Sequence, residues 1–157
     1  YLADMYADRI LYNLNQTSFK IFGARGSNPG EFKQPYGIKV LPNGRIFITE
    51  YENHRLNIFQ NSRGNITLIK SFGGYGIGIG QFKFPRYCDL DIDGNLYVLD
   101  GGNRRIQKFD QNGNPILAFE GGTVNYFTVL SKTRGVTVTR DNNIYIYINN
   151  LWRNIKI

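Results

Sequence analysis

The chain has 157 residues, the size of one domain, and its 41% hydrophobic and 20% charged residues are typical of a folded protein and exclude extended disorder. No apolar run approaches the ~20 residues that a membrane helix needs, so we predict no membrane insertion. The net charge of +7 is spread over both halves of the chain, and it suits nucleic acid, anionic lipid or an acidic protein without selecting one of them.

One repeat runs along the chain. A partial copy opens it at residues 1–11, and two full copies follow at residues 30–59 and 80–109, which align without a gap at a period of 50 residues. A further copy begins near Thr133 and drifts from the pattern.

Each full copy predicts four short strands. The expected strands of the two copies are 38–41, 45–50, 55–60 and 66–72, then 88–92, 95–100, 105–110 and 115–119. We expect two-residue turns at Asn43-Gly44 and Asp93-Gly94, because both residues of such a pair tolerate positive φ. No segment shows a convincing period of 3.6 residues, so the sequence predicts an all-β chain of four-stranded antiparallel units.

The ordered motifs resemble those of the NHL-repeat family of β-propellers. The family pattern runs Gly-x-Phe-x-x-Pro-x-Gly, Asp-Gly-Asn-Leu-Tyr-Val-x-Asp, Asn-x-Arg-Ile and Phe-Gly, and this chain has GEFKQPYGI, DGNLYVLD, NHRL, NRRI and SFGG in those places. The resemblance implies a single propeller segment of about three to four blades. Its expected divisions are a partial blade at 1–23, blades at 24–73 and 74–121, and a degenerate or partial blade at 122–157.

Such a segment does not close the ring of about six blades that the resemblance implies. The chain also begins at Tyr1 rather than at a methionine. We therefore expect it to be part of a larger or completed propeller. The remaining blades of the same propeller, or another subunit, would then cover the open sheet edges.

One acidic stretch imitates a calcium loop. Asp89, Asp91, Asp93, Gly94 and Asp100 fall on positions 1, 3, 5, 6 and 12 of an EF-hand. The repeat places the same stretch on a strand, a turn and a strand, with no flanking helices. We therefore predict no calcium site.

A carboxylate is followed five residues later by an arginine in three copies of the repeat. The pairs are Asp4 and Arg9, Glu50 and Arg55, and Asp100 and Arg105. The spacing spans the connection between the second and third strands, so we expect an ion pair to brace each blade there. A group that recurs in every blade is more consistent with a structural than with a catalytic role.

Three other features are interpreted as structural. The glycine-rich stretch 73–80 lacks the strand and helix that flank a phosphate-binding loop, so we predict an inter-blade loop. His54 is the single histidine and stands where the family pattern often has one, and Cys88 is predicted to be a small buried residue. The sequence thus predicts no catalytic residue, no metal and no cofactor.

Basic and aromatic residues are predicted to gather on one face of the propeller, where the inter-blade loops and the loops between second and third strands meet. This candidate partner-binding face comprises Arg25, Lys33, Tyr36, Tyr51, His54, Lys83, Arg86, Tyr87, Arg104 and Arg134. Arginines suit RNA phosphates and aromatic rings suit RNA bases.

From these features we predict that the chain is not an enzyme but an interaction scaffold, chiefly for protein partners. The alternative is an RNA-binding propeller that uses the basic and aromatic face. A third interpretation is part of a propeller hydrolase or lyase, in which other blades complete the active site. We find no motif for sequence-specific DNA binding, and the sequence indicates no compartment.

Overall fold

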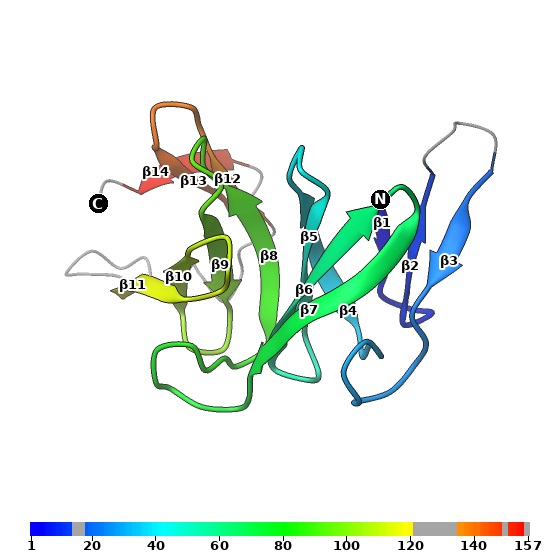
Figure 1. The fold of residues 1–157 in the computed structure, drawn as a ribbon. Helices are drawn as coiled ribbons and strands as arrows, with labels where there is room; N and C mark the ends of the chain where they lie inside the picture. Colours follow the sequence, from blue (N-terminus) through cyan, green and yellow to red (C-terminus); the bar gives the residue numbers. More distant parts are fainter. Residues whose placement is uncertain (14–17, 121–134, 149–150, 156–157) are drawn as a thin grey trace.

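The computed structural model describes residues 1–13, 18–120, 135–148 and 151–155, which fold into a series of antiparallel β-sheets (Figure 1). The first sheet contains β1 (Leu2–Asp4), β2 (Arg9–Tyr12) and β3 (Lys20–Phe22). The second contains β4 (Pro35–Val40), β5 (Arg45–Glu50), β6 (Arg55–Ser62) and β7 (Asn65–Gly73). The third contains β8 (Pro85–Leu90), β9 (Leu96–Asp100), β10 (Arg105–Phe109) and β11 (Pro115–Glu120). The fourth contains β12 (Val136–Val138), β13 (Ile144–Ile148) and β14 (Leu151–Ile155).

The second and third sheets confirm the predicted four-stranded units. In both, the strands lie in chain order and each is antiparallel to its neighbour. This meander is the arrangement of a propeller blade. Within the described residues, no helix is long and apolar enough to span a membrane.

The turns between the first and second strands differ from the prediction. Only the glycine of each pair has positive φ, +85° at Gly44 and +79° at Gly94. The amide of Leu41 donates to the Arg45 carbonyl and the amide of Gly44 donates to the Leu41 carbonyl, which defines a three-residue loop closed by a glycine. The predicted two-residue turns are wrong because residues 42–44 and 92–94 each form a three-residue loop, in which Asn or Asp precedes a glycine that takes the left-handed conformation.

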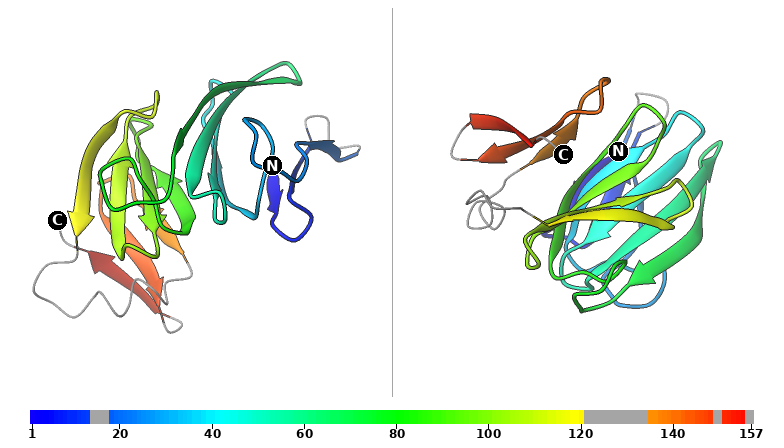
Figure 2. Two further views of the ribbon diagram at one scale, coloured as in Figure 1. Left: turned by 90° about the horizontal axis from the view of Figure 1, so that it is seen from below. Right: turned by 90° about the vertical axis from the view of Figure 1, so that its left-hand side faces the viewer.

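The sheets follow one another around an arc, and each packs face to face on the next (Figures 1 and 2). Strand β4 contacts β1 of the preceding sheet and β8 of the following one, and β8 in turn contacts β12. The first strand of each sheet therefore lies at the junction between blades.

Three apolar clusters fill the spaces between neighbouring sheets. The cluster between the second and third sheets has the buried members Phe47, Leu56, Ile58, Phe82, Cys88, Leu96, Val98 and Phe109. Ile46 and Ile48 of β5 belong to the cluster shared with the first sheet. Strand β5 thus buries side chains on both of its faces, which explains why its centre, Ile46-Phe47-Ile48, is apolar without alternation.

Cys88 is buried, as predicted. Burial raises the pKa of its thiol to about 12, so the group remains neutral and unreactive near neutral pH.

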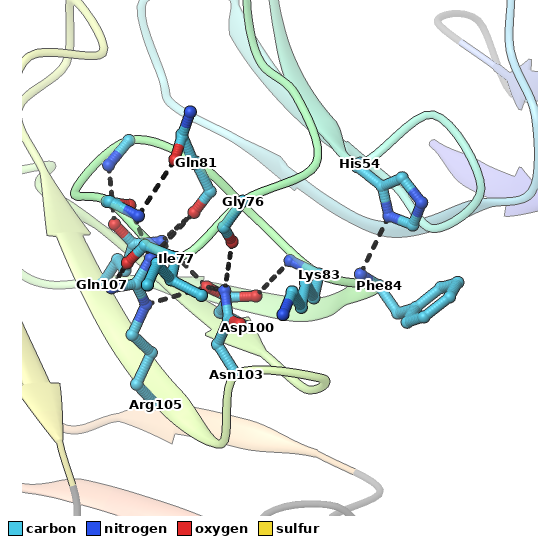
Figure 3. A network of polar contacts seen from close by, with 12 residues as sticks. His54, Gly76, Ile77, Gln81, Lys83, Phe84, Asp100, Asn103, Arg105 and Gln107 are labelled. Carbon is cyan, nitrogen blue, oxygen red and sulfur yellow. Dashed lines mark hydrogen bonds and ion pairs between the residues drawn. The ribbon is translucent and has the colours of Figure 1, made fainter.

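The three predicted ion pairs are present, and two of them are buried hubs. Asp100 Oδ2 accepts hydrogen bonds from Arg105 Nε at 2.9 Å, Asn103 Nδ2 at 2.9 Å and Gln107 Nε2 at 3.0 Å (Figure 3). Its Oδ1 accepts the Lys83 amide at 2.7 Å. The carboxylate therefore fastens the turn between β9 and β10 to the loop that enters β8.

Glu50 repeats this hub in the second sheet, where it accepts hydrogen bonds from Arg55, Asn53, Asn57 and the Lys33 amide. Asp4 and Arg9 form the corresponding pair in the first sheet, with the Asp4 Oδ2 to Arg9 Nε distance at 3.0 Å and both side chains partly exposed. The recurrence supports the structural role predicted for these pairs.

Candidate functional site

The strand register brings two sets of loops to the same end of the sheets. Pro35 pairs with Glu50, and Arg55 pairs with both Glu50 and Gly73. The third sheet repeats this pattern, with Pro85 opposite Asp100. The inter-blade loops therefore lie beside the turns between second and third strands, at what we call the loop end.

Six rings at the loop end form a continuous series, the aromatic row. Its members are Tyr87, Tyr36, Tyr51, Phe84, His54 and Tyr75. Neighbouring ring centroids lie 4.6 to 5.9 Å apart, which is contact distance for aromatic pairs. The row begins on β4 and β8, passes through the turn between β5 and β6, and ends in the loop between β7 and β8. It therefore crosses the junction of the second and third sheets.

Two cations lie over rings of this row. The Lys83 ammonium is 5.0 Å from the Tyr75 ring centroid, and the Arg86 guanidinium carbon is 5.4 Å from the Tyr51 ring centroid. The rings are only partly covered, with Phe84 38% exposed and Tyr75 64% exposed. The surface offers flat apolar area and positive charge together, which suits an aromatic ligand that carries an anionic or carbonyl oxygen.

His54 joins the two sheets through its ring. Its Nδ1 accepts the Phe84 amide at 3.1 Å, so the neutral ring carries its proton on Nε2 (Figure 3). Asp8 Oδ1 accepts the Gln34 amide at 2.7 Å in the same way at the preceding junction. All four residues have positive φ, so this contact recurs with its backbone geometry between neighbouring blades.

Protonation of His54 is incompatible with the contact, because Nδ1 would then carry a hydrogen that points at the Phe84 amide. Partial burial lowers the pKa of His54. The negative charges of Asp100 and Glu52 favour the protonated ring, but their effect is smaller than that of burial. The folded chain therefore binds this proton less readily than the unfolded chain does. As a result, the free energy of unfolding should fall as the pH drops below about 6.5, where the unfolded imidazole protonates.

A His54→Asn variant should lose less stability on acidification than the wild type. Asparagine tolerates positive φ and keeps a short acceptor, as Asp8 does at the other junction. Urea unfolding of both proteins at about pH 7.5 and pH 5.5 measures the difference. Identical pH dependence in the two proteins would show that the His54 contact contributes nothing to stability.

Six of the ten residues predicted for the partner-binding face meet in the row or over it: Tyr36, Tyr51, His54, Lys83, Arg86 and Tyr87. Arg25 instead pairs with Asp8, with 3.4 Å between Nη1 and Oδ2, at the junction with the first sheet. Lys33 precedes β4 and donates its amide to Glu50. Arg104 lies exposed in the turn between β9 and β10, and Arg134 lies outside the described residues.

Two members of the row, Tyr75 and Phe84, were not predicted. Tyr75 lies in the glycine-rich stretch that was interpreted only as a connection, and Phe84 directly precedes the β8 proline. For Phe84 the available signal was an aromatic residue next to Lys83 and near Arg86 in the sequence.

Two carboxylates of the calcium-like stretch form ion pairs with lysines. Asp89 Oδ1 is 2.8 Å from Lys39 Nζ, and Asp91 Oδ2 is 3.0 Å from Lys108 Nζ. Burial alone would raise the pKa of Asp89, but the hydrogen bonds from Lys39 and from the Val138 amide outweigh it and hold the pKa below its usual value. Across the part of the chain that the structure describes, no three His, Cys, Asp or Glu residues gather as metal ligands would.

Comparison with known proteins confirms the repeat and the fold. Residues 32–59 match the family model of the NHL repeat, so the chain carries an NHL repeat and the resemblance to that family is confirmed. No curated protein matches the chain. With its successive antiparallel sheets and its propeller neighbours among solved structures, the chain has an all-β fold of the β-propeller type.

Three solved structures illustrate the similarity. Virginiamycin B lyase from Staphylococcus aureus matches with a TM-score of 0.69 and 21% identity over 98% of this chain and 47% of its own. The nidogen/laminin complex matches with a TM-score of 0.62 and 19% identity over 90% of this chain and 48% of the other. A putative 6-phosphogluconolactonase from Bacteroides uniformis matches with a TM-score of 0.53 and 15% identity over 89% of this chain and 46% of its own. The chain thus spans about half the length of these structures.

These neighbours correct the prediction of a non-catalytic scaffold. That prediction, and with it the exclusion of an enzyme, was drawn from the lack of a catalytic constellation in the sequence. The neighbours include a lyase and a putative lactonase, so the same arrangement of blades occurs in enzymes. Blades of this kind are therefore no ground for excluding catalysis.

Proposed function

We propose that the chain contributes a substrate-binding wall to a propeller enzyme of the lyase or lactonase kind. The aromatic row is the observation that carries this proposal. It is a partly exposed, cation-flanked surface that crosses two blades at the loop end, beside the first strands of both. The proposal is also supported by two propeller neighbours, one named as a lyase and the other as a putative lactonase.

The substrate that fits this wall is an organic molecule with an aromatic or flat apolar group and an ester or carboxylate oxygen. Its flat group would stack on the exposed faces of Phe84 and Tyr75. The oxygen would accept hydrogen bonds from Lys83, which lies over the Tyr75 ring, or from Arg86, which lies over the neighbouring Tyr51 ring.

We propose further that additional blades complete the ring and supply the reacting groups. The chain spans about half of the propellers that it resembles. Exposed apolar side chains also lie in or beside the first and fourth sheets, with Phe19 62% and Trp152 53% exposed. Such surfaces are normally covered by a neighbouring blade in a repeat protein.

A Tyr51→Ala variant of the protein that carries this chain should raise the KM for aromatic ring esters about tenfold. Tyr51 contacts the rings on both of its sides and lies under Arg86, so its loss interrupts the row at its centre. Initial rates over a range of substrate concentrations separate KM from kcat.

The matched control is Tyr6→Ala. Tyr6 is 92% exposed in the corresponding turn of the first sheet, outside the row, and its loss should leave KM unchanged. Equal effects of the two variants would contradict the proposal. RNA binding that weakens steeply with salt, without any turnover, would instead make the row a nucleic-acid surface.

A further inference from the structure

The loop between β7 and β8 exposes apolar side chains beside the aromatic row. Within residues 74–82, here named the apolar loop, Tyr75, Ile77 and Ile79 are 64%, 72% and 61% exposed. The loop lies at the lower edge of the molecule in Figure 1. Three large apolar side chains on one short connection are an unusual concentration for a surface in contact with water.

The glycines of the loop determine which way it faces. A Cβ at Gly76 would come within 2.2 Å of Gln81 Oε1, and one at Gly78 would come within 3.0 Å of the same atom. These positions thus face Gln81, whereas Tyr75, Ile77 and Ile79, which alternate with them, expose their side chains to solvent.

Hydrogen bonds from the third sheet hold the loop backbone. Asn103 Nδ2 donates to the Gly76 carbonyl at 2.8 Å, and Arg105 donates to the Ile77 and Gly78 carbonyls at 2.6 and 2.7 Å (Figure 3). Gln107 Oε1 accepts the Gly80 amide at 2.9 Å. These polar groups are satisfied from inside the protein, so the loop can meet an apolar medium without losing their partners.

Positive charge accompanies the loop. Lys83 lies over the Tyr75 ring, and the Lys83 carbonyl accepts the Gly102 amide at 2.7 Å, which brings the turn that carries exposed Arg104 alongside. The chain as a whole carries +7. An apolar tip with a cationic rim matches an anionic lipid surface, where apolar side chains enter and cations meet the headgroups.

The equivalent loop of the preceding blade shows that the fold does not require apolar residues here. Arg55 donates to the Ser27 and Asn28 carbonyls just as Arg105 does to those of Ile77 and Gly78. The same backbone arrangement thus carries Ser27 at the place of Ile77. The apolar composition is a property of this one loop.

We propose that the apolar loop docks the protein on anionic membranes, with Ile77 and Ile79 entering the headgroup region and Arg104 contacting lipid phosphates, while Tyr75 and Lys83 stay with the aromatic row. The sequence-based prediction of no membrane insertion concerned a spanning helix, whereas this contact is peripheral. A lipid surface is favoured over a protein partner because the exposed isoleucines belong to a loop at the edge of the molecule (Figure 1) and the adjoining turn carries the exposed cation Arg104.

Co-sedimentation with vesicles tests this proposal. The protein should bind phosphatidylcholine vesicles that contain phosphatidylserine and bind pure phosphatidylcholine vesicles much more weakly. An Ile77→Ser/Ile79→Ser variant should bind the anionic vesicles at least about tenfold more weakly. Ile92→Ser is the matched control, because Ile92 is 69% exposed in the turn that follows β8, at the opposite end of the sheet. Its binding should equal that of the wild type.

A fluorescent label tests insertion directly. A polarity-sensitive dye on an Ile77→Cys variant should shift its emission to the blue when anionic vesicles are added, and the same dye on Ile92→Cys should not. Cys88 is buried and should not react with the dye. Wild-type protein that ignores anionic vesicles, or binding that the serine variant leaves intact, would overturn the proposal. Loss of a protein partner in the serine variant without any vesicle binding would assign the loop to protein docking instead.

Discussion

Replacing Asp100 by alanine is expected to lower the free energy of unfolding by about 3–5 kcal/mol. The carboxylate is fully buried and accepts hydrogen bonds from Lys83, Asn103, Arg105 and Gln107. Its removal leaves the Arg105 guanidinium without its counter-charge, on a side chain of which only 4% is exposed. A buried cation without a partner is among the most destabilising changes that a single substitution can produce.

Urea denaturation of the wild type and of Asp100→Ala measures this effect, and the first sheet provides a control. Asp4 pairs with Arg9 at the equivalent place, but their side chains are 26% and 40% exposed. Asp4→Ala should therefore cost no more than about 1 kcal/mol. If the two variants lost the same free energy of unfolding, burial of the ion pair would not determine how much it stabilises the protein.

Replacing Phe82 by alanine is expected to cost about 3–5 kcal/mol. Phe82 is fully buried between the second and third sheets, and its ring centroid lies 5.7 Å from that of Phe109 and 6.3 Å from that of Phe72. Truncation leaves a cavity at the junction between blades, where both sheets contribute to the core.

Phe82→Leu should restore much of this stability, because it refills most of the cavity with apolar volume. Phe84→Ala is a second control, two residues along the same segment, where the ring is 38% exposed and its removal should cost much less. Thermal and urea unfolding of the three variants rank their losses of stability. A Phe84→Ala loss as large as that of Phe82→Ala would contradict the assignment of Phe82 to the inter-blade core.

The sequence predicted the strands well because strand pairing repeats at a fixed period. The predicted strand 45–50 coincides with β5, and 55–60 falls within β6. The hairpin turns were not predicted correctly, since the identity of a glycine fixes where φ is positive but not where the ladder of hydrogen bonds closes. The last hydrogen bond of the hairpin joins the Leu41 amide to the Arg45 carbonyl, so the loop contains three residues instead of the predicted two.

Details of the buried hubs depend on the length of single side chains, which a repeat pattern does not resolve. Gln107 both donates to Asp100 and accepts the Gly80 amide. Its counterpart Asn57 is one methylene shorter and donates to Glu50, but its Oδ1 has no hydrogen-bond partner within the described residues. Two blades with nearly the same sequence pattern therefore differ in how completely their polar groups are satisfied.

The candidate site was predicted in part. Its cations and most of its rings follow from the rule that inter-blade loops and the turns between second and third strands share one face. The sequence does not show that Tyr75 turns toward His54, since that contact depends on the path of a loop that is anchored by Arg105. The prediction of a scaffold failed because it took the lack of catalytic motifs in this chain as a property of the whole propeller.

Product analysis by mass spectrometry tests the central claim most directly. The protein that carries this chain would be incubated with a panel of aromatic lactones and cyclic esters. We predict ring opening of at least one of them, with a product that has gained one water if the enzyme is a lactonase, or has the same mass as the substrate if it is a lyase. Conversion should be slowed in Tyr51→Ala and unchanged in Tyr6→Ala. Recovery of every substrate intact, or conversion that is indifferent to Tyr51, would contradict the assignment of the aromatic row to an enzyme's substrate site.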